Sequence, residues 1–313
     1  MELEFIQWLR AHLPPDPRAK LGLSDDAALL SMPAGREAVV TTDLLTDGVD
    51  FELGKHSLAR IGRQALAANL SDLAAMAARP HSAFISVALP RGGGANYTPL
   101  EMAIGLYEGI LPLAAEFDIT IAGGDTNTYD GPLVLSVTAV GETIGRGPLT
   151  RSGGRPGDWL LVTGELGGSI LGHMLDFTPR VREALLLHES YELHAGIDIS
   201  DGLALDASRL AKASGCGAVL NLDRVPISQD AIRLSISEGG ADLQPTALRH
   251  ALSDGQDFEL LIAASQQVAE QILNDQPVKC AIAHVGKLIS EPGLWQTTGG
   301  ERTPLEEIGW RHE

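Results

Sequence analysis

Short apolar runs along the chain predict strands, and two longer segments with helical periodicity separate them. Three of these runs are residues 37–43, 83–90 and 133–142. A fourth strand is predicted at residues 119–122, followed by a turn at Gly123-Gly124-Asp125. The Ala-rich residues 55–78 and residues 98–117 predict helices. The order strand, helix, strand, helix, strand, strand predicts an α/β layer of about 145 residues.

A second set of patterns follows residues 151–158, which are rich in glycine, proline and charge. This composition is typical of a connection between domains, so we predict an N-terminal domain at 1–148 and a C-terminal domain at 149–313. Residues 197–215 predict a strand, a turn and a helix that ends at glycine. Further strands are predicted directly after residue 158, at 258–264 and at 281–289. The predicted fold is therefore a two-domain α/β (α+β) protein.

The composition restricts the functional class before any single residue is considered. The 313 residues carry 23 Lys and Arg against 41 Asp and Glu, a net charge of −18, which argues against a general nucleic-acid binder. No apolar run reaches the ~18 residues of a membrane span, and the acidic start of the chain is unlike a signal peptide. Two cysteines, Cys216 and Cys280, are too few for a disulfide framework, so we expect a reducing, cytoplasmic setting.

Asp72 is the most informative single residue, because it lies where a core residue is expected. On a helical wheel at ~100° per residue, one narrow arc contains Leu58, Ile61, Ala65, Asp72 and Met76. A buried, unpaired carboxylate costs several kcal/mol, so Asp72 needs a cation, which would be Lys, Arg or a metal ion. A salt bridge near the end of the helix is the simpler interpretation of a lone aspartate, and it stays open at this point.

Further aspartates stand beside small or hydroxyl residues where strands and turns are expected. They occur in Ser24-Asp25-Asp26-Ala27, Thr41-Thr42-Asp43, Gly123-Gly124-Asp125-Thr126 and Asp198-Ile199-Ser200-Asp201. Mg²⁺ prefers such oxygen ligands and usually keeps water and substrate phosphates, whereas zinc would need a His and Cys cluster that the sequence lacks. Each aspartate alone could be a helix N-cap or a turn residue. Together, the clusters favour a phosphate site that holds several Mg²⁺ ions.

Candidate phosphate-binding residues are less distinctive than the acids. The sequence contains neither a Walker-type GxxxxGK[ST] loop nor the HRD and DFG motifs of protein kinases. The glycine turn at residues 164–169 could present backbone N–H groups to an anion, or it could be an ordinary strand-to-helix turn. Arg146 follows a predicted strand and could bind phosphate through its guanidinium, or could be a solvated turn residue.

Several motifs occur in the order found in one known family: SDDAALL, VVTTDLLTDGVDF, AANLSDLAAMAA, IAGGDT, LTRSGGRPGDWLLVTGELGGS, IDISDGL and SDGQDFELL. On these motifs the chain resembles the thiamine-monophosphate kinases, which are part of the aminoimidazole-ribonucleotide-synthetase-like superfamily. The resemblance spans about residues 20–265, with a last match at Gly309-Trp310-Arg311-His312. It implies two α/β domains, and a barrel that the N-terminal domains of two subunits close across a homodimer interface.

The resemblance further implies that ATP and thiamine monophosphate react to give thiamine diphosphate and ADP. The Mg²⁺-site positions that it implies are Asp25, Thr41, Thr42, Asp43, Asp72, Asp125, Asp198 and Asp201. ATP contacts are implied at Gly124, Arg146 and Ser200, with Tyr107 near the nucleotide. The residue chemistry agrees, because the nucleophile would be an anionic phosphate oxygen of the substrate, which needs no general base.

Three further positions concern the molecule that accepts the phosphate group. By the resemblance, Trp310 occupies the aromatic position of the family's C-terminal motif, where an indole face would attract the thiazolium cation. The same ring could instead anchor the tail of the chain. Asp50 stands where the family has His, and Gln256 stands where it has a Glu that contacts the pyrimidine. These departures leave open another acceptor within the superfamily, or a relative that binds nucleotide or thiamine phosphates without catalysis.

Overall fold

The structure of the chain is a computed structural model that describes residues 2–13, 19–21, 29–30, 32–239 and 243–311. The chain divides into two compact units. Unit 1 comprises Met1–Leu73 and Arg79–Thr143, and unit 2 comprises Ala74–Ala78 and Ile144–Glu313. This division falls a few residues before the boundary predicted after residue 148. None of the described helices is long and apolar enough to cross a membrane.

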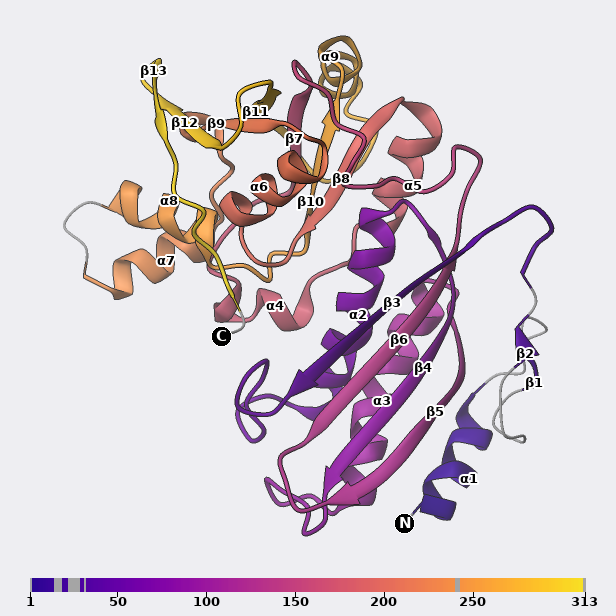
Figure 1. The fold of residues 1–313 in the computed structure, drawn as a ribbon. Helices are drawn as coiled ribbons and strands as arrows, with labels where there is room; N and C mark the ends of the chain where they lie inside the picture. The colour runs from indigo at the N-terminus through magenta and orange to yellow at the C-terminus, as the bar shows by residue number, and fades with distance from the viewer. Residues whose placement is uncertain (1, 14–18, 22–28, 31, 240–242, 312–313) are drawn as a thin grey trace. The chain divides into compact units, whose positions relative to one another are not determined.

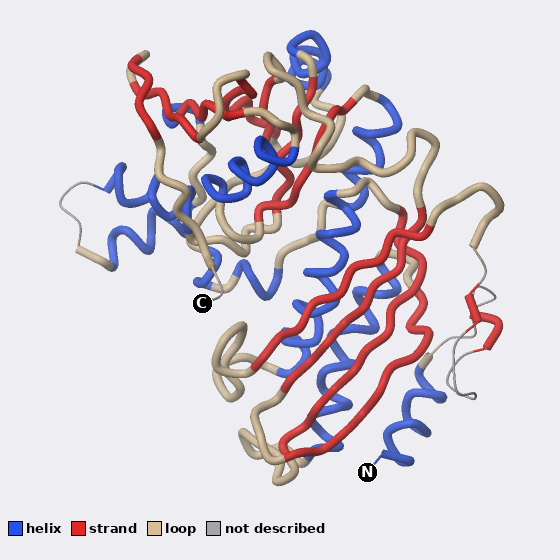
Figure 2. Tube along the Cα trace, in the orientation of Figure 1, coloured by secondary structure: helices blue, strands red, loops and turns tan. Residues whose placement is uncertain are grey.

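Unit 1 is a four-stranded sheet with two long helices on one of its faces (Figure 1). The strand order is β3-β6-β4-β5, in which β4 and β5 are parallel and the other neighbours are antiparallel. Figure 2 shows these strands in front of the helices. The elements of unit 1 are α1 (Glu2–His12), β1 (Ala19–Leu21), β2 (Leu29–Leu30), β3 (Ala38–Thr46), α2 (Leu58–Ala75), β4 (Arg79–Pro90), α3 (Pro99–Glu116), β5 (Thr120–Tyr129) and β6 (Val134–Glu142).

The helices and strands predicted for this part of the chain are confirmed, although β3, β4 and β5 are longer than predicted. The residues at the start of α3 explain why a helix begins there. Thr98 caps the helix by accepting from the Glu101 N–H, and the Glu101 side chain accepts from the Thr98 N–H in return. Pro99 follows at the first helical position, where its missing N–H costs nothing.

The predicted turn at Gly123-Gly124-Asp125 is wrong, because these residues lie inside β5. Gly124 pairs with Ile85 of β4, and a Cβ atom on Gly124 would lie 1.8 Å from the Ile85 carbonyl oxygen. Glycine therefore allows β5 to continue close beside β4. The local pattern could not reveal this, because two glycines before an aspartate are equally typical of a turn.

Unit 2 is built on a seven-stranded sheet of order β13-β12-β9-β11-β7-β10-β8. Strands β9 and β12 are parallel, and the other neighbours are antiparallel. The elements of unit 2 are β7 (Trp159–Thr163), η1 (Ser169–Leu171), α4 (His173–Asp176), α5 (Val181–Ser190), β8 (Leu193–Ile199), α6 (Leu203–Ala213), β9 (Gly217–Asn221), η2 (Leu222–Arg224), α7 (Gln229–Ser237), α8 (Leu243–Ser253), β10 (Glu259–Ala264), α9 (Gln266–Asp275), β11 (Ile282–Ile289), β12 (Leu294–Thr298) and β13 (Glu301–Pro304).

The core of unit 2 lies between this sheet and α6. Val162 of β7, Ile197 of β8, Leu210 of α6 and Leu261 of β10 belong to one buried cluster, and none is more than 1% exposed. The predicted strand, turn and helix at residues 197–215 are confirmed as β8 and α6. Strands β10 and β11 also lie where they were predicted. This core fixes the turn between β8 and α6, which carries several of the predicted site residues.

Candidate functional site

Thr41, Asp43 and Asp72 come together between β3 and α2 in unit 1. Alternation along β3 turns Thr41 and Asp43 towards the same face as the buried Val39 and Leu45. Asp72 approaches from α2, where it is half-buried, and the Thr41 hydroxyl donates a hydrogen bond to its carboxylate. The apolar arc on which the sequence places Asp72 therefore does face the sheet.

Burial and like charge make this acidic cluster unfavourable on its own. The pKa of the half-buried Asp43 is raised to about 7, first by loss of contact with water and then by the negative charges of Asp72 and Asp50. Asp50 is held by the connection after β3, since the Thr46 N–H donates to its carboxylate at 2.7 Å. The raised pKa shows that the three carboxyl groups disfavour one another's negative charge. A cation placed among them would offset this repulsion and would therefore bind favourably.

The cluster fits a hard divalent cation that is shared with a substrate. Among the described residues, no group of three or more His, Cys, Asp and Glu side chains could hold a metal ion by itself. Mg²⁺ is commonly held by one or two carboxylates together with water and substrate phosphates, which a cluster of this size can provide. Asp25, a further predicted ligand, lies outside the described residues.

Two other predicted ligands of unit 1 are turned away from the cluster. The Thr42 hydroxyl donates to the Val137 carbonyl at 3.2 Å and lies 3.0 Å from the Thr138 hydroxyl, and its side chain is exposed. Asp125 pairs with Ser86 in the sheet, and both side chains lie on the face that the helices leave open. Side chains alternate between the two faces of a strand, and this alternation separates both residues from Asp43.

A salt-bridge network holds the Ser200-Asp201 turn of unit 2. Arg209 of α6 donates to the carboxylates of both Asp201 and Asp206, at 2.8 Å in the case of Asp206. Asp206 also accepts from the Asp201 N–H at 2.9 Å, and burial is the main cause that raises its pKa to about 6. A guanidinium therefore neutralises Asp201, while Asp198 is buried in β8. This role of Arg209 was not predicted from the sequence, where no cation on α6 was considered.

Two residues that are predicted to contact the substrate thiamine monophosphate lie against this same turn, although they are distant from it in the sequence. The Gln256 N–H donates to the Ser200 carbonyl at 2.7 Å, and the Trp310 N–H donates to the Asp201 carbonyl at 2.9 Å. Gly309 permits the second approach, since a Cβ atom there would lie 2.4 Å from the Asp201 carbonyl oxygen. The Trp310 side chain is 54% exposed, so much of the indole lies at the surface.

Tyr107 and Arg146 occupy very different surroundings. Tyr107 is 2% exposed in α3 and packs edge-on against Phe5 of α1, with 5.3 Å between ring centroids. Burial also raises the pKa of its hydroxyl, and the ring has a packing role that gives the predicted nucleotide contact no support. Arg146 is exposed in the turn between Ile144 and Gly147, as expected for either interpretation of this residue.

The glycine turn after β7 binds carboxylates of the chain itself. The Gly167 N–H donates to Asp257 Oδ1 at 2.8 Å, and the Gly168 N–H donates to Asp254 Oδ2 at 2.9 Å. Of the two interpretations of this turn, phosphate binding is excluded for these two N–H groups, because carboxylates already occupy them. The N–H groups of this glycine turn do bind anions, but these anions are carboxylates from the segment before β10.

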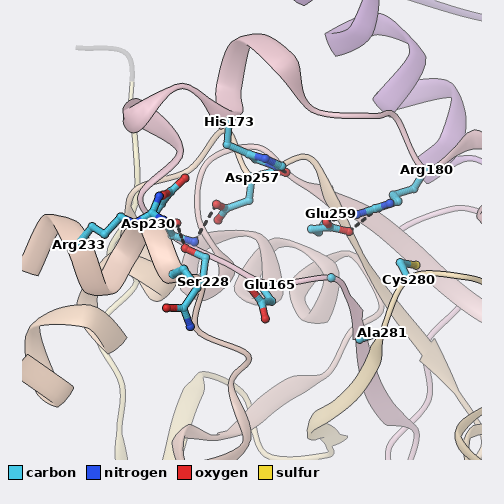
Figure 3. A pocket seen from close by; sticks show the side chains of 13 residues that line it. Glu165, His173, Arg180, Ser228, Asp230, Arg233, Asp257, Glu259, Cys280 and Ala281 are labelled. Atoms are coloured by element: carbon cyan, nitrogen blue, oxygen red, sulfur yellow. Dashed lines mark hydrogen bonds and ion pairs between the residues drawn. The ribbon is translucent and has the colours of Figure 1, made fainter.

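A cavity of about 570 Å³ lies beside this turn (Figure 3). Arg180 and Glu259 form two hydrogen bonds at one part of its wall, at 2.5 and 2.7 Å. Neither residue was predicted from the sequence to have a role. Glu259 stands at a buried position of β10, and a charge within the apolar run at 258–264 is the signal that could have revealed this pair.

The chain matches the AIR synthase related protein N-terminal domain over residues 24–143 and the corresponding C-terminal domain over residues 155–294. It is 42% identical to thiamine-monophosphate kinase of Rhodopirellula baltica, over 95% of this chain and 92% of that protein. The crystal structure of thiamine-monophosphate kinase from Stenotrophomonas maltophilia K279a has a TM-score of 0.79 and 32% identity, over 95% of this chain and 96% of that one. A structure described as AaThiL complexed with AMPPCP and TMP shares the fold, with a TM-score of 0.76 and 24% identity over 92% of this chain and 91% of that one.

Proposed function

Since this chain belongs to the thiamine-monophosphate kinase family of AIR synthase related proteins, we propose that it phosphorylates thiamine monophosphate with ATP, giving thiamine diphosphate and ADP. The observation that carries this proposal is the acidic cluster of unit 1. There Thr41 binds Asp72, and Asp43 has a pKa raised to about 7 by burial and by its acidic neighbours. Such a site repels phosphate groups unless it holds cations, which is the arrangement that a phosphoryl-transfer site requires.

The reaction needs no general base. The attacking atom is an oxygen of the acceptor's own phosphate group, which is already anionic at neutral pH. Transfer then depends on in-line positioning of the two reactants and on neutralisation of their charge. Carboxylates and a threonine hydroxyl suit this task, and they are what the cluster contains.

We propose several Mg²⁺ ions as the counter-charge. Asp43 and Asp72 would hold Mg²⁺, Thr41 orients the Asp72 carboxylate, and Asp50 adds negative charge beside them. Bound Mg²⁺ neutralises phosphate charge and orients the transferred group. The other ligands implied by the family remain proposals: Asp25, Thr42, Asp125, Asp198 and Asp201.

In unit 2 we propose that the Ser200-Asp201 turn, Gln256 and Trp310 contact the reactants. The exposed indole of Trp310 suits the thiazolium cation, an attraction worth ~0.5–2 kcal/mol. The Gln256 side chain offers an amide that both donates and accepts hydrogen bonds, as an aminopyrimidine does. We propose that ATP contacts Ser200, Gly124 and Arg146. The exposed guanidinium of Arg146 suits a phosphate group.

We also propose that unit 1 pairs with a second copy of the chain. The sheet face opposite the helices exposes Val40 at 60% and Leu44 at 63%. A second sheet laid on this face would bury these side chains, and the family resemblance implies a barrel of this kind. Sedimentation of the full chain should therefore give a dimer, and the double variant Val40→Asp, Leu44→Asp should give a folded monomer. A monomeric wild type would contradict this pairing.

The cytoplasm is the location that we propose for the enzyme. Cys216 and Cys280 are both free thiols. Free thiols are typical of a reducing compartment, which is also where ATP is available. Cell fractionation with an antibody against the full chain would test this location.

A panel of phosphate acceptors tests the proposed reaction. The purified full chain is incubated with Mg²⁺ and γ-labelled ATP, and with thiamine monophosphate, thiamine or a nucleoside monophosphate in separate reactions. We expect label in thiamine diphosphate alone. Label in another phosphate would assign the chain to another acceptor, and nucleotide binding without turnover with any acceptor would indicate a non-catalytic relative.

A further inference from the structure

Asp257, which lines the cavity of about 570 Å³ in unit 2, has a buried carboxylate oxygen without a partner among the described residues. Asp257 is 1% exposed, and its Oδ1 accepts from the Gly167 N–H at 2.8 Å. Its Oδ2 has no hydrogen-bond partner among the described residues. Figure 3 shows this carboxyl group among the side chains that line the cavity. A buried polar atom in this state carries its full desolvation cost, so a ligand that donates to it would bind favourably.

The charged side chains of the cavity form two neutral pairs and leave two further acidic side chains. Arg180 is paired with Glu259 through two hydrogen bonds, and Arg233 is paired with Asp230 at 2.8 Å. Each of these pairs is neutral, and both arginines are therefore occupied. The two further acids are the buried Asp257 and the exposed Glu165, and His173 lines the cavity beside them. A positively charged ligand complements this lining.

Burial also shows how Asp257 would respond to such a ligand. It raises the pKa of this carboxyl group well above its ordinary value, and the nearby acids Asp254 and Glu259 act in the same direction. Burial without a counter-charge therefore disfavours the ionised form of Asp257. A cation placed at Oδ2 would favour the ionised form and gain a charge-assisted hydrogen bond.

We propose that this cavity is a ligand site for a small organic cation with N–H donors, of the amidine or aminopyrimidine type. Its volume is that of a small-molecule site, and the described residues provide no group of three metal-ligating side chains there. An anion is disfavoured because the Gly167 and Gly168 N–H groups already bind carboxylates. The Arg180–Glu259 pair shows the same recognition inside the cavity, a planar nitrogen cation on a carboxylate. None of the lining residues is among those proposed above for Mg²⁺, ATP or thiamine monophosphate.

Calorimetric titration of the full chain with benzamidine tests the site, because this probe carries a planar cation with several N–H donors. Benzyl alcohol is the neutral probe of similar size. Asp257→Asn keeps an acceptor for the Gly167 N–H and presents an amide in place of the charged oxygen. We expect benzamidine to bind the wild type and to bind Asp257→Asn at least about tenfold more weakly. The matched control Asp130→Asn removes a surface carboxylate of unit 1, and its affinity should equal that of the wild type.

Glu165→Lys serves as a second variant, since Glu165 is exposed and its replacement leaves the buried network in place. At low ionic strength it should also weaken benzamidine binding, through repulsion. Competition by thiamine monophosphate would identify the aminopyrimidine of the substrate as the natural source of the cation, and lack of competition would identify a separate small amine. The proposal is overturned if the wild type does not bind benzamidine, if benzyl alcohol binds equally well, or if a folded Asp257→Asn or Glu165→Lys retains the full affinity.

Discussion

Replacing Asp43 by asparagine is expected to stabilise the metal-free protein while it slows phosphoryl transfer by at least ~10²-fold. The Asp43 pKa is raised from 3.8 to about 7, a difference of 7 − 3.8 ≈ 3, and burial contributes most, followed by Asp72 and Asp50. At ~1.4 kcal/mol for each pKa unit, the ionised group costs the folded state at most about 4 kcal/mol. Asp43 is half-buried, so water lowers this cost, and we expect about 1–3 kcal/mol.

The stabilisation should depend on pH in a defined direction. Because the pKa is raised in the folded state, the unfolded carboxyl group loses its proton near pH 4, and the folded one keeps it until about pH 7. The contribution of Asp43 to stability is thus fully present below about pH 4 and is lost as the pH rises to about 7. Asparagine does not titrate, so the advantage of Asp43→Asn should be about 1–3 kcal/mol larger near pH 8 than near pH 4.

Urea denaturation in the presence of a chelator measures this difference directly. Wild type and variant are unfolded near both pH values, and acids that do not interact with Asp43 cancel in the comparison. Asp130→Asn, which replaces an exposed carboxylate, should follow the wild type at both. Parallel pH profiles, or an Asp43→Asn protein that is less stable than the wild type near pH 8, would refute the argument that Asp43 is held in an unfavourable acidic cluster.

Substitutions at three further positions test other parts of the two units. Asp72→Asn should lower turnover by ~10²-fold or more, because a neutral side chain binds Mg²⁺ poorly, and full activity would exclude the metal role. Trp310→Leu should raise the KM for thiamine monophosphate by ~3- to 30-fold with little change in the KM for ATP, and Trp310→Phe should recover most of the loss. A lower Tm with both KM values unchanged would instead assign the ring to packing. Arg209→Gln should lower the free energy of unfolding by about 1–3 kcal/mol in urea, since Asp206, whose side chain is 1% exposed, loses its counter-charge; an unchanged value would contradict the network.

Local patterns predicted the elements of the site well where the signal is short-range. The periodicity of residues 55–78 located α2 and placed Asp72 on its sheet-facing side. The motif order also predicted the family, because several short motifs in one order are far more specific than any one of them. The pattern of strand 37–43 placed Thr41 and Asp43 near one another, and the structure adds that they share the helix-covered face.

The remaining features depend on pairing across the sheet and between distant segments, which no local pattern reports. Thr42 and Asp125 resemble ligands in the sequence, yet alternation and register turn them to the other face. The turn predicted around Asp125 became a strand because Gly124 can approach β4. Arg209 and the unpartnered oxygen of Asp257 are defined by their neighbours in space, so only the structure reveals them.

Parallel measurement of ADP and thiamine diphosphate tests most directly whether the acidic cluster of unit 1 supports phosphoryl transfer. Wild type and Asp43→Asn are incubated with ATP, thiamine monophosphate and Mg²⁺, after both are shown to be folded by thermal denaturation. We predict equal amounts of the two products from the wild type, and formation of both at least ~10²-fold slower in the variant. ADP without thiamine diphosphate from the wild type, or undiminished thiamine diphosphate formation by Asp43→Asn, would contradict the proposed function of this cluster.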